Sequence, residues 1–333
     1  MAAPRRQEGM IDAAFYCISS EVYFLGAVGL INSLRLVGHD EPIFLLDCGL
    51  EPHHRELVAP HVTLVDAPSD APPYMLKTVA PRRHPADVRV LIDVDMVATR
   101  PLRPLIDSVV QGGVAAVKDR LDRFVPEWGE LLDLGAIEQR PYLSSGMVCL
   151  GGAPGEEVLE LWSDRLRRVD FGRSYFADDV AGYPFRYIDQ DVLNAVIAAR
   201  VDPERAAVIE ARLAPSQPFR GLRVRDEATL RTAYSDGTEP YVLHHPYPRK
   251  PWLERMYHGL YSRLLARLLL GDDVAVRVPH DEVPLRMRGG FVAGLERKRV
   301  DAQDLVRWYA RDVIPEWVEA RVGALRRRTG GRP

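Results

Sequence analysis

Two carboxylates lie close together near the end of an apolar, β-branched run, residues 88–97. Asp93 and Asp95 are nearly its only polar side chains. Residues two apart on a strand point to the same side of a sheet, so both carboxylates would project together. Like charges that close raise each other's pKa unless a cation lies between them, and carboxylate oxygens suit Mg²⁺ or Mn²⁺. The alternative is a strand-end turn with two solvated aspartates, which an Asp-x-Asp alone does not exclude.

Three further segments carry polar groups where a purely structural role would not require them. Asp189, Gln190 and Asp191 open an expected helix, although an acid at that position often acts only as a cap. Residues 244–252 contain two histidines, a lysine and a tryptophan, although a single histidine is more often structural than a ligand. Residues 141–146 end in small side chains, where a sugar could approach the backbone or where a strand simply begins.

Taken together, these segments resemble the retaining nucleotide-sugar glycosyltransferases of the glycogenin and lipopolysaccharide-galactosyltransferase kind (family eight, GT-A fold). The resemblance extends from about Phe15 to Trp252, roughly three quarters of the chain. Its landmarks follow the family's order: Lys77, sixteen residues before Asp93; Leu91-Ile92-Asp93-Val94-Asp95; Asp189-Gln190-Asp191-Val192-Leu193-Asn194; and His244, six residues before Lys250-Pro251-Trp252. Each motif is short, and the ordered set carries the resemblance.

The resemblance implies a metal site. Asp93, Asp95 and His244 would bind one divalent cation, and the imidazole favours Mn²⁺ over Mg²⁺ because imidazole suits transition metals. The cation would bridge the diphosphate of a UDP-sugar and offset charge on the leaving UDP. Lys250 would add a positive charge beside the same phosphates.

The resemblance also implies a donor site and a reaction. The donor-binding residues would be Cys17, Ser19, Ser20 and Tyr23 around the nucleoside, with Lys77, Ser144, Ser145, Gly146 and Lys250 nearer the diphosphate and sugar. Asp189 would bind sugar hydroxyls, and Gln190 would lie near the anomeric carbon, opposite the leaving group. A carboxamide is a poor nucleophile, which favours front-face transfer with Gln190 as an electrostatic stabiliser. A double displacement through Asp191 is the alternative.

Several positions depart from the family pattern. Tyr247 stands where the family commonly has glycine, which would let backbone approach a phosphate closely. His245 competes with His244 as the ligand, and Ser144 replaces the usual asparagine of the sugar-facing strand. The sequence does not choose between UDP-glucose and UDP-galactose type donors. It does not identify the acceptor as a glycan, a lipid-linked sugar or a small molecule.

The elements that must position these residues alternate along the chain. We expect strands over 13–18, 43–47, 62–65, 88–97, 113–117, 145–152 and 241–244, and helices over 22–36, 55–58, 74–79, 156–168 and 191–199. Pro126 and Pro315 are each expected at the first position of a helix. This alternation favours a parallel sheet covered on both faces, with ligands beyond the carboxyl ends of the strands. The resemblance specifies the class: an α/β, Rossmann-like mixed sheet flanked by helices.

Composition sets the remaining limits. The 333 residues are 47% hydrophobic and 27% charged with a net charge of -3, as in a soluble globular protein without nucleic acid as its main partner. There is no apolar run of about 18 residues and no signal-peptide pattern, and the three cysteines lack metal-type spacing, so we expect a cytoplasmic protein with free thiols. We expect a catalytic domain over 10–252, with a nucleotide-sugar half (10–100) and an acceptor half (101–252), and a helical extension over 253–333.

The extension supports two hypotheses. An apolar stripe at helical spacing over 253–269 is flanked by arginines, and a helix over 302–328 ends in three more. These features are compatible with peripheral contact at the anionic inner face of a membrane. The alternative, which we favour, is that the stripe packs on the catalytic domain or on a second copy in a homodimer.

Two other functions compete with glycosyl transfer. A sugar nucleotidyltransferase would show a Gly-rich loop with a basic residue after the first strand, and residues 17–23 contain none. A non-catalytic sugar-nucleotide-binding scaffold would not need all three metal-ligand positions together with Lys250 and Gln190.

Overall fold

The computed structural model describes residues 12–302, except 69–70, 248–249, 254–258, 289, 292–293, 296–297 and 300–301. Of the helix expected over 302–328, only Ala302 lies among the described residues, so that helix and the one expected at Pro315 stay predictions. Within the described part, no helix is both long enough and apolar enough to cross a membrane.

A seven-stranded mixed sheet forms the centre of the molecule, in the order β3-β2-β1-β4-β7-β6-β8. The strands are β1 Ala13–Ser19, β2 Ile43–Asp47, β3 Thr63–Asp66, β4 Val88–Ile92, β6 Gly113–Lys118, β7 Leu143–Gly151 and β8 Ala206–Ile209. β7 runs antiparallel to both of its neighbours, β4 and β6, while the other pairs are parallel. The α/β class with a mixed sheet is confirmed, and the purely parallel sheet suggested by the alternation is wrong.

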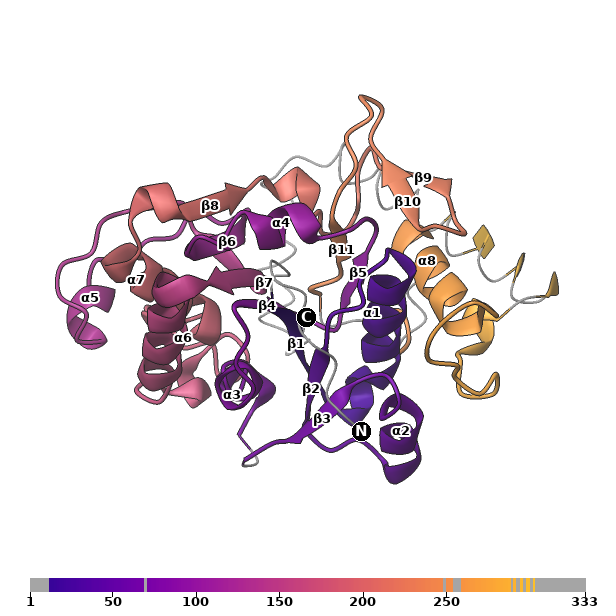
Figure 1. The fold of residues 1–333 in the computed structure, drawn as a ribbon, viewed down its shortest axis with the longest axis horizontal. Coiled ribbons are helices and arrows are strands. Elements are labelled where there is room, and N and C mark those ends of the chain that lie inside the picture. The colour runs from indigo at the N-terminus through magenta and orange to yellow at the C-terminus, as the bar shows by residue number, and fades with distance from the viewer. Residues whose placement is uncertain are drawn as a thin grey trace, which may run out of the picture.

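Helices cover both faces of the sheet (Figure 1). One face packs against α1 (Phe24–Leu36) and α8 (Gly259–Leu270), and the other against α6 (Gly152–Leu166) and α7 (Ile188–Arg200). β1 illustrates the reason: Phe15 and Cys17 belong to one apolar core, while Ala14 and Tyr16 belong to the other. A strand buried on both faces needs a continuous apolar run, which matches the sequence of β1.

The run 88–97 is two strands, not the one expected. β4 ends at Ile92, and β5 (Met96–Ala98) leaves the central sheet to pair antiparallel with β11 (Val242–His244). The backbone N–H of Met96 donates to the Asp93 carbonyl at 3.1 Å and closes the intervening turn. Asp93 and Asp95 therefore lie in a turn between two sheets.

Smaller differences concern short elements. The segment expected as one helix over 74–79 forms the 3-10 turn η2 (Pro73–Met75) and the helix α3 (Val79–Arg83). α5 (Trp128–Leu131) begins two residues after Pro126, so this proline does not occupy the first helical position. β8 and the hairpin of β9 (Arg223–Asp226) and β10 (Arg231–Ala233) were not predicted. The remaining short helices are α2 (Pro52–Val58) and α4 (Arg103–Asp107).

The apolar stripe of the extension packs inside the molecule. In α8, Tyr261, Leu264, Leu265 and Leu268 are fully buried and belong to the same core as α1. A Cβ added at Gly29 of α1 would lie 2.4 Å from Leu265 Cδ1, which shows how closely the two helices approach. For residues 259–270 the intramolecular alternative is confirmed, and this face is not available to a membrane or a second copy.

Asn32 of α1 links α1 to α8 and to the segment after it by hydrogen bonds. Its buried amide donates to the carbonyls of Leu268 and Val276, each at 2.8 Å, and its Oδ1 accepts from the Val276 N–H at 2.7 Å. Asn32→Leu removes all three hydrogen bonds, and each such bond contributes about 0.5–1.5 kcal/mol to stability.

We expect Asn32→Leu to lower the free energy of unfolding by about 2–4 kcal/mol in urea titrations. The exposed Glu160→Gln on α6 is the control, with an expected change within about 0.5 kcal/mol. Equal stability of Asn32→Leu and the parent protein would contradict this account of how α8 is held.

Candidate functional site

The two acids and a distant histidine converge at the carboxyl edge of the sheet. Asp93 directly follows β4, Asp95 lies in the turn, and His244 is the last residue of β11. One ligand atom from each lies within 4.8 Å of the others, and His244 Nε2 is 3.3 Å from Asp95 Oδ1. The three residues come together because the β5–β11 pairing places His244 opposite Met96, the residue that follows Asp95. Two carboxylates and an imidazole at this spacing can hold a divalent cation.

The Asp95 carboxylate is held in its charged form, and only one of its two oxygens accepts a hydrogen bond among the described residues. Lys250 Nζ donates to Asp95 Oδ2 at 2.6 Å and to the His245 carbonyl at 2.5 Å. Burial alone would raise the pKa of Asp95, but the Lys250 ammonium and His244 lower it well below its usual range. Asp95 Oδ1 is buried, and among the described residues it accepts no hydrogen bond. A buried, charged oxygen facing an imidazole nitrogen is a position that a cation would satisfy.

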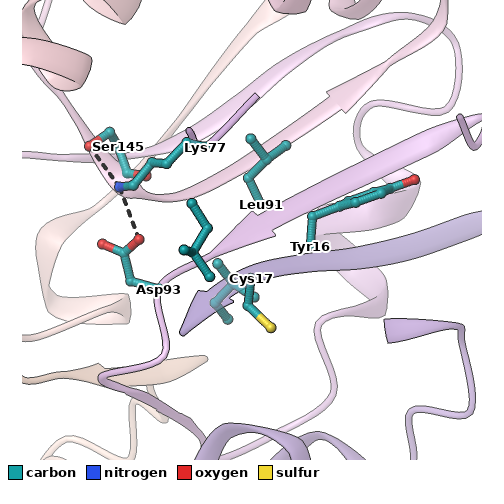
Figure 2. A pocket seen from close by; sticks show the side chains of 8 residues that line it. Tyr16, Cys17, Lys77, Leu91, Asp93 and Ser145 are labelled. Atoms are coloured by element: carbon teal, nitrogen blue, oxygen red, sulfur yellow. Dashed lines mark hydrogen bonds and ion pairs between the residues drawn. The ribbon is translucent and has the colours of Figure 1, made fainter. Parts of the chain in front are cut away.

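Asp93 is the more exposed of the two acids. Its side chain is 32% exposed, and Lys77 Nζ lies 2.9 Å from its Oδ1 (Figure 2). Burial raises the pKa of Asp93, Lys77 offsets part of that rise, and Asp95 adds to it. A divalent cation bound between the two carboxylates would favour the ionised form of both.

Lys77 connects the acid pair to α7. Its ammonium lies 3.0 Å from Asp189 Oδ2 and donates to the carbonyl and hydroxyl oxygens of Ser145 at 3.2 and 3.3 Å. Ser145 Oγ in turn donates to Asp189 Oδ2 at 2.7 Å, and the Ser145 N–H donates to Gln190 Oε1 at 3.1 Å. Ile188, which precedes Asp189, has φ of 37°, a strained value for a β-branched residue. The chain therefore fixes Asp189 and Gln190 against β7 at a conformational cost.

Asp191 points away from this cluster. It is fully buried, and its carboxylate accepts from Arg123 Nε at 2.8 Å, Tyr142 Oη at 2.6 Å and the Tyr187 N–H at 2.8 Å. Burial raises its pKa, while Arg123 acts in the opposite direction. These hydrogen bonds hold the first turn of α7 in place.

The predicted donor loop after β1 is only partly open. The side chains of Cys17 and Ser19 are buried, and burial raises the pKa of the Cys17 thiol to about 12. The cavity beside Cys17, Lys77 and Asp93 measures only about 10 Å³, room for about one water (Figure 2). Ser20 and Tyr23 are partly exposed, and the Tyr23 ring centroid lies 5.6 Å from Lys250 Nζ.

The absence of a side chain at Gly146 leaves space beside Asp93 and His244. Its carbonyl accepts from the Asp93 N–H at 2.8 Å, and its N–H donates to Ser144 Oγ at 3.2 Å. A Cβ at this position would lie 2.8 Å from His244 Cε1 and 3.3 Å from Asp93 Oδ2. Of the small residues at this strand entry, Gly146 is thus the one that touches the predicted metal ligands.

The two neighbouring histidines differ in placement. His245 is fully buried, with its Nδ1 3.1 Å from Gln217 Nε2, whereas the His244 side chain is 14% exposed beside Asp95. In the described part of the chain, His244 is the histidine that groups with the acid pair.

Asp119 and Arg123, which contact Gln190 and Asp191, were not predicted from the sequence. Gln190 Nε2 donates to Asp119 Oδ2 at 3.1 Å, so Asp119 and Ser145 together fix the orientation of this carboxamide. Asp119 directly follows β6, and the rule that sites form beyond the carboxyl ends of strands could have identified it. Arg123 lies in an irregular segment with no such signal.

Solved structures share this fold. No family model matches the sequence, and no curated protein matches it. The galactosyltransferase LgtC, in complex with donor and acceptor sugar analogs, is 16% identical, with a TM-score of 0.51 over 80% of this chain and 98% of that one. An active-site mutant of LgtC is 14% identical with the same coverage and TM-score. The bifunctional glycosyltransferase WbbM is 14% identical, with a TM-score of 0.50 over 79% of this chain and 51% of that one. The GT-A fold implied by the resemblance is confirmed.

We expect Gly146→Ala to weaken Mn²⁺ binding about tenfold, because its methyl group displaces the His244 ring, and such shifts typically cost 10–100-fold in metal affinity. Isothermal titration calorimetry measures the change. Gly294→Ala, where an added Cβ meets nothing within 4 Å, is the matched control. Unchanged Mn²⁺ affinity in Gly146→Ala would contradict a cation bound between Asp93 and His244.

Proposed function

We propose that the protein is a metal-dependent glycosyltransferase that moves a hexose from a UDP-sugar to an acceptor with retention of anomeric configuration. The observation that carries the proposal is the convergence of Asp93, Asp95 and His244 within 4.8 Å, from segments far apart in the chain. The network from Lys77 to Asp189 and Gln190 lies beside this group. This combination suits a departing diphosphate next to a bound sugar.

Asp93, Asp95 and His244 would hold Mn²⁺, or Mg²⁺ as the second choice, since an imidazole ligand favours the transition metal. When bound, the ion would offset negative charge on the leaving UDP. Lys250 keeps Asp95 ionised and positions its free oxygen, and this contact supports a positioning role in addition to the expected contact with phosphate.

The sugar would lie against Asp189 and Gln190. Lys77 and Ser145 hold Asp189 Oδ2, which orients its carboxylate toward sugar hydroxyls. The Gln190 amide accepts a hydrogen bond from Ser145 at Oε1 and donates one to Asp119 from Nε2. This fixed orientation favours an electrostatic role at the anomeric carbon. The Asp191 carboxylate already accepts hydrogen bonds from Arg123 and Tyr142. These contacts disfavour its use as a nucleophile in a double displacement, so we favour front-face transfer.

A second cavity supports an assignment for the acceptor. It measures about 390 Å³, and its lining includes Arg120, Ser216, Arg220, Tyr234 and Tyr247. This volume falls within the range of small-molecule sites.

Two lining residues connect the cavity to the proposed reacting groups. The carbonyl of Pro215, another lining residue, accepts from the His244 N–H at 3.0 Å, and Arg120 follows Asp119, the partner of Gln190. Two tyrosine rings suit a sugar face, and two guanidinium groups suit a carboxylate or phosphate. We therefore assign a negatively charged saccharide to this cavity.

UDP release tests the main proposal. With Mn²⁺ and either UDP-glucose or UDP-galactose, we expect the parent protein to release UDP and Asp95→Asn to lose activity by roughly 100-fold or more, because a metal ligand is removed. Asp107→Asn, an exposed aspartate on α4, is the control. Tight UDP-sugar binding without turnover in the parent protein would favour the scaffold. Pyrophosphate release from UTP and a sugar 1-phosphate would favour the nucleotidyltransferase.

The acceptor assignment has its own test. We expect glucuronate or glucose 6-phosphate to accept the sugar better than glucose, and Arg120→Ala to raise the KM for the charged acceptor about tenfold, as expected for one charge-assisted hydrogen bond. UDP release by hydrolysis should stay unchanged, and Arg120→Lys should recover part of the loss. Equal use of charged and neutral acceptors, with hydrolysis intact, would contradict the acceptor assignment and leave glycosyl transfer standing.

A further inference from the structure

A second histidine cluster lies outside the proposed catalytic site. His53 and His54 occupy the first turn of α2, and Glu282 comes from the segment after α8. One ligand atom from each of the three lies within 4.8 Å of the others. The proposed glycosyl transfer uses none of these residues.

The Nε2 atoms of His53 and His54 both face the carboxylate of Glu282. His54 Nε2 lies 2.8 Å from Glu282 Oε2, and His53 Nε2 lies 3.7 Å from Glu282 Oε1. Zinc–nitrogen and zinc–oxygen bonds of about 2.0–2.1 Å in a tetrahedral site place ligand atoms about 3.3 Å apart. The two observed separations lie on either side of that value, so small side-chain shifts complete the geometry.

The other nitrogen of each ring faces a second carboxylate. His54 Nδ1 is 2.8 Å from Glu21 Oε1, and His53 Nδ1 is 3.5 Å from Glu51 Oε2. The Glu51 N–H donates to Glu21 Oε2 at 2.8 Å, which holds Glu21 in place. Metal-binding histidines characteristically donate their remaining N–H to a carboxylate, which fixes the tautomer and orients the ring.

The His54 ring lies between two carboxylates. Its Nε2 is hydrogen-bonded to Glu282 Oε2 at 2.8 Å, and its Nδ1 lies 2.8 Å from Glu21 Oε1 but forms no hydrogen bond of good geometry among the described residues. A metal ion in place of the Nε2 proton would leave the single N–H of a neutral ring at Nδ1, beside Glu21. One metal ion would satisfy His54, His53 and Glu282 together, whereas protonation needs a separate proton for each ring.

We propose that His53 Nε2, His54 Nε2 and Glu282 form a Zn²⁺ site with Glu21 and Glu51 as orienting partners. Two imidazoles and one carboxylate suit zinc better than Mg²⁺ or Ca²⁺, which prefer oxygen ligands. The His53 side chain is 51% exposed, so the fourth position opens to solvent and takes a water.

The site would join three segments of the fold. α2, the segment of Glu282 and the turn η1 (Glu21–Tyr23) meet at His54, whose ring also stacks on Phe24 at 3.5 Å between centroids. Zinc binding therefore stabilises the packing of the extension on the loop that carries Tyr23.

Zinc titration of metal-stripped protein tests the site without using activity. The full chain carries Asp93→Asn and Asp95→Asn, so that the first site does not compete. We expect one equivalent of Zn²⁺ by calorimetry, the visible absorption of tetrahedral Co²⁺ on substitution, and a rise in Tm of about 5 °C at saturating Zn²⁺.

Three further changes in that background identify the ligands. Glu282→Gln should weaken Zn²⁺ binding by at least tenfold and abolish the Co²⁺ spectrum, and Glu21→Gln should weaken binding about tenfold through the ring of His54. Asp281→Asn, at the exposed neighbouring residue, should bind as the parent does. Absence of saturable binding, or equal affinity in Glu282→Gln and Asp281→Asn, would overturn the proposal. So would a Tm that varies with pH but not with Zn²⁺, since protons alone would then bridge the cluster.

Discussion

The short antiparallel pairing of β5 with β11 is the contact on which the candidate site depends. It occupies only three residues on each strand, yet it brings His244 next to an acid pair about 150 positions earlier in the chain. Lys250 reinforces the pairing by bonding both Asp95 and the His245 carbonyl. Trp252, which closes the same segment, donates to the Val22 carbonyl at 2.8 Å and packs where a Cβ on Gly26 would stand. These contacts fix the loop after β1, the acid pair and His244 to one another.

Charge balance explains why such a site is stable and still receptive to a cation. The ammonium groups of Lys77 and Lys250 contact the carboxylates of Asp93, Asp95 and Asp189, which leaves an excess of one negative charge. Buried charges persist only when they are paired, and each lysine here has at least one carboxylate partner within 3.0 Å. Lys250 and His244 lower the pKa of Asp95 while burial raises that of Asp93, and a divalent ion between the two carboxylates would favour the ionised form of both.

Much of the fold could be predicted because its strands are buried on both faces. β1, β2 and β6 are continuous apolar runs, and their limits follow from composition. The division of residues 88–97 could not be foreseen, since both halves are apolar and only the partner strand differs. The antiparallel direction of β7 could not be predicted from its residues either, because the direction in which two strands pair leaves no pattern in the local sequence.

The ordered motifs reached site residues that are far apart in the chain, such as Asp93 and His244, and missed residues that belong to no motif. The acid pair of Asp93 and Asp95 and the helix start at Asp189 were visible in sequence. His54 was not, because its partner Glu282 lies 228 residues away. The clash of Gly146 with His244 and the bond of Asp119 with Gln190 likewise appear only after folding.

The most direct test of the metal site is pulsed electron paramagnetic resonance of bound Mn²⁺ in protein carrying ¹⁵N-labelled histidine. The account predicts coupling to one imidazole nitrogen, present in the parent protein and absent in His244→Asn. The Glu282→Gln background removes any contribution from the second histidine cluster. Bound Mn²⁺ without histidine coupling, or coupling that survives His244→Asn, would contradict the claim that Asp93, Asp95 and His244 bind one cation.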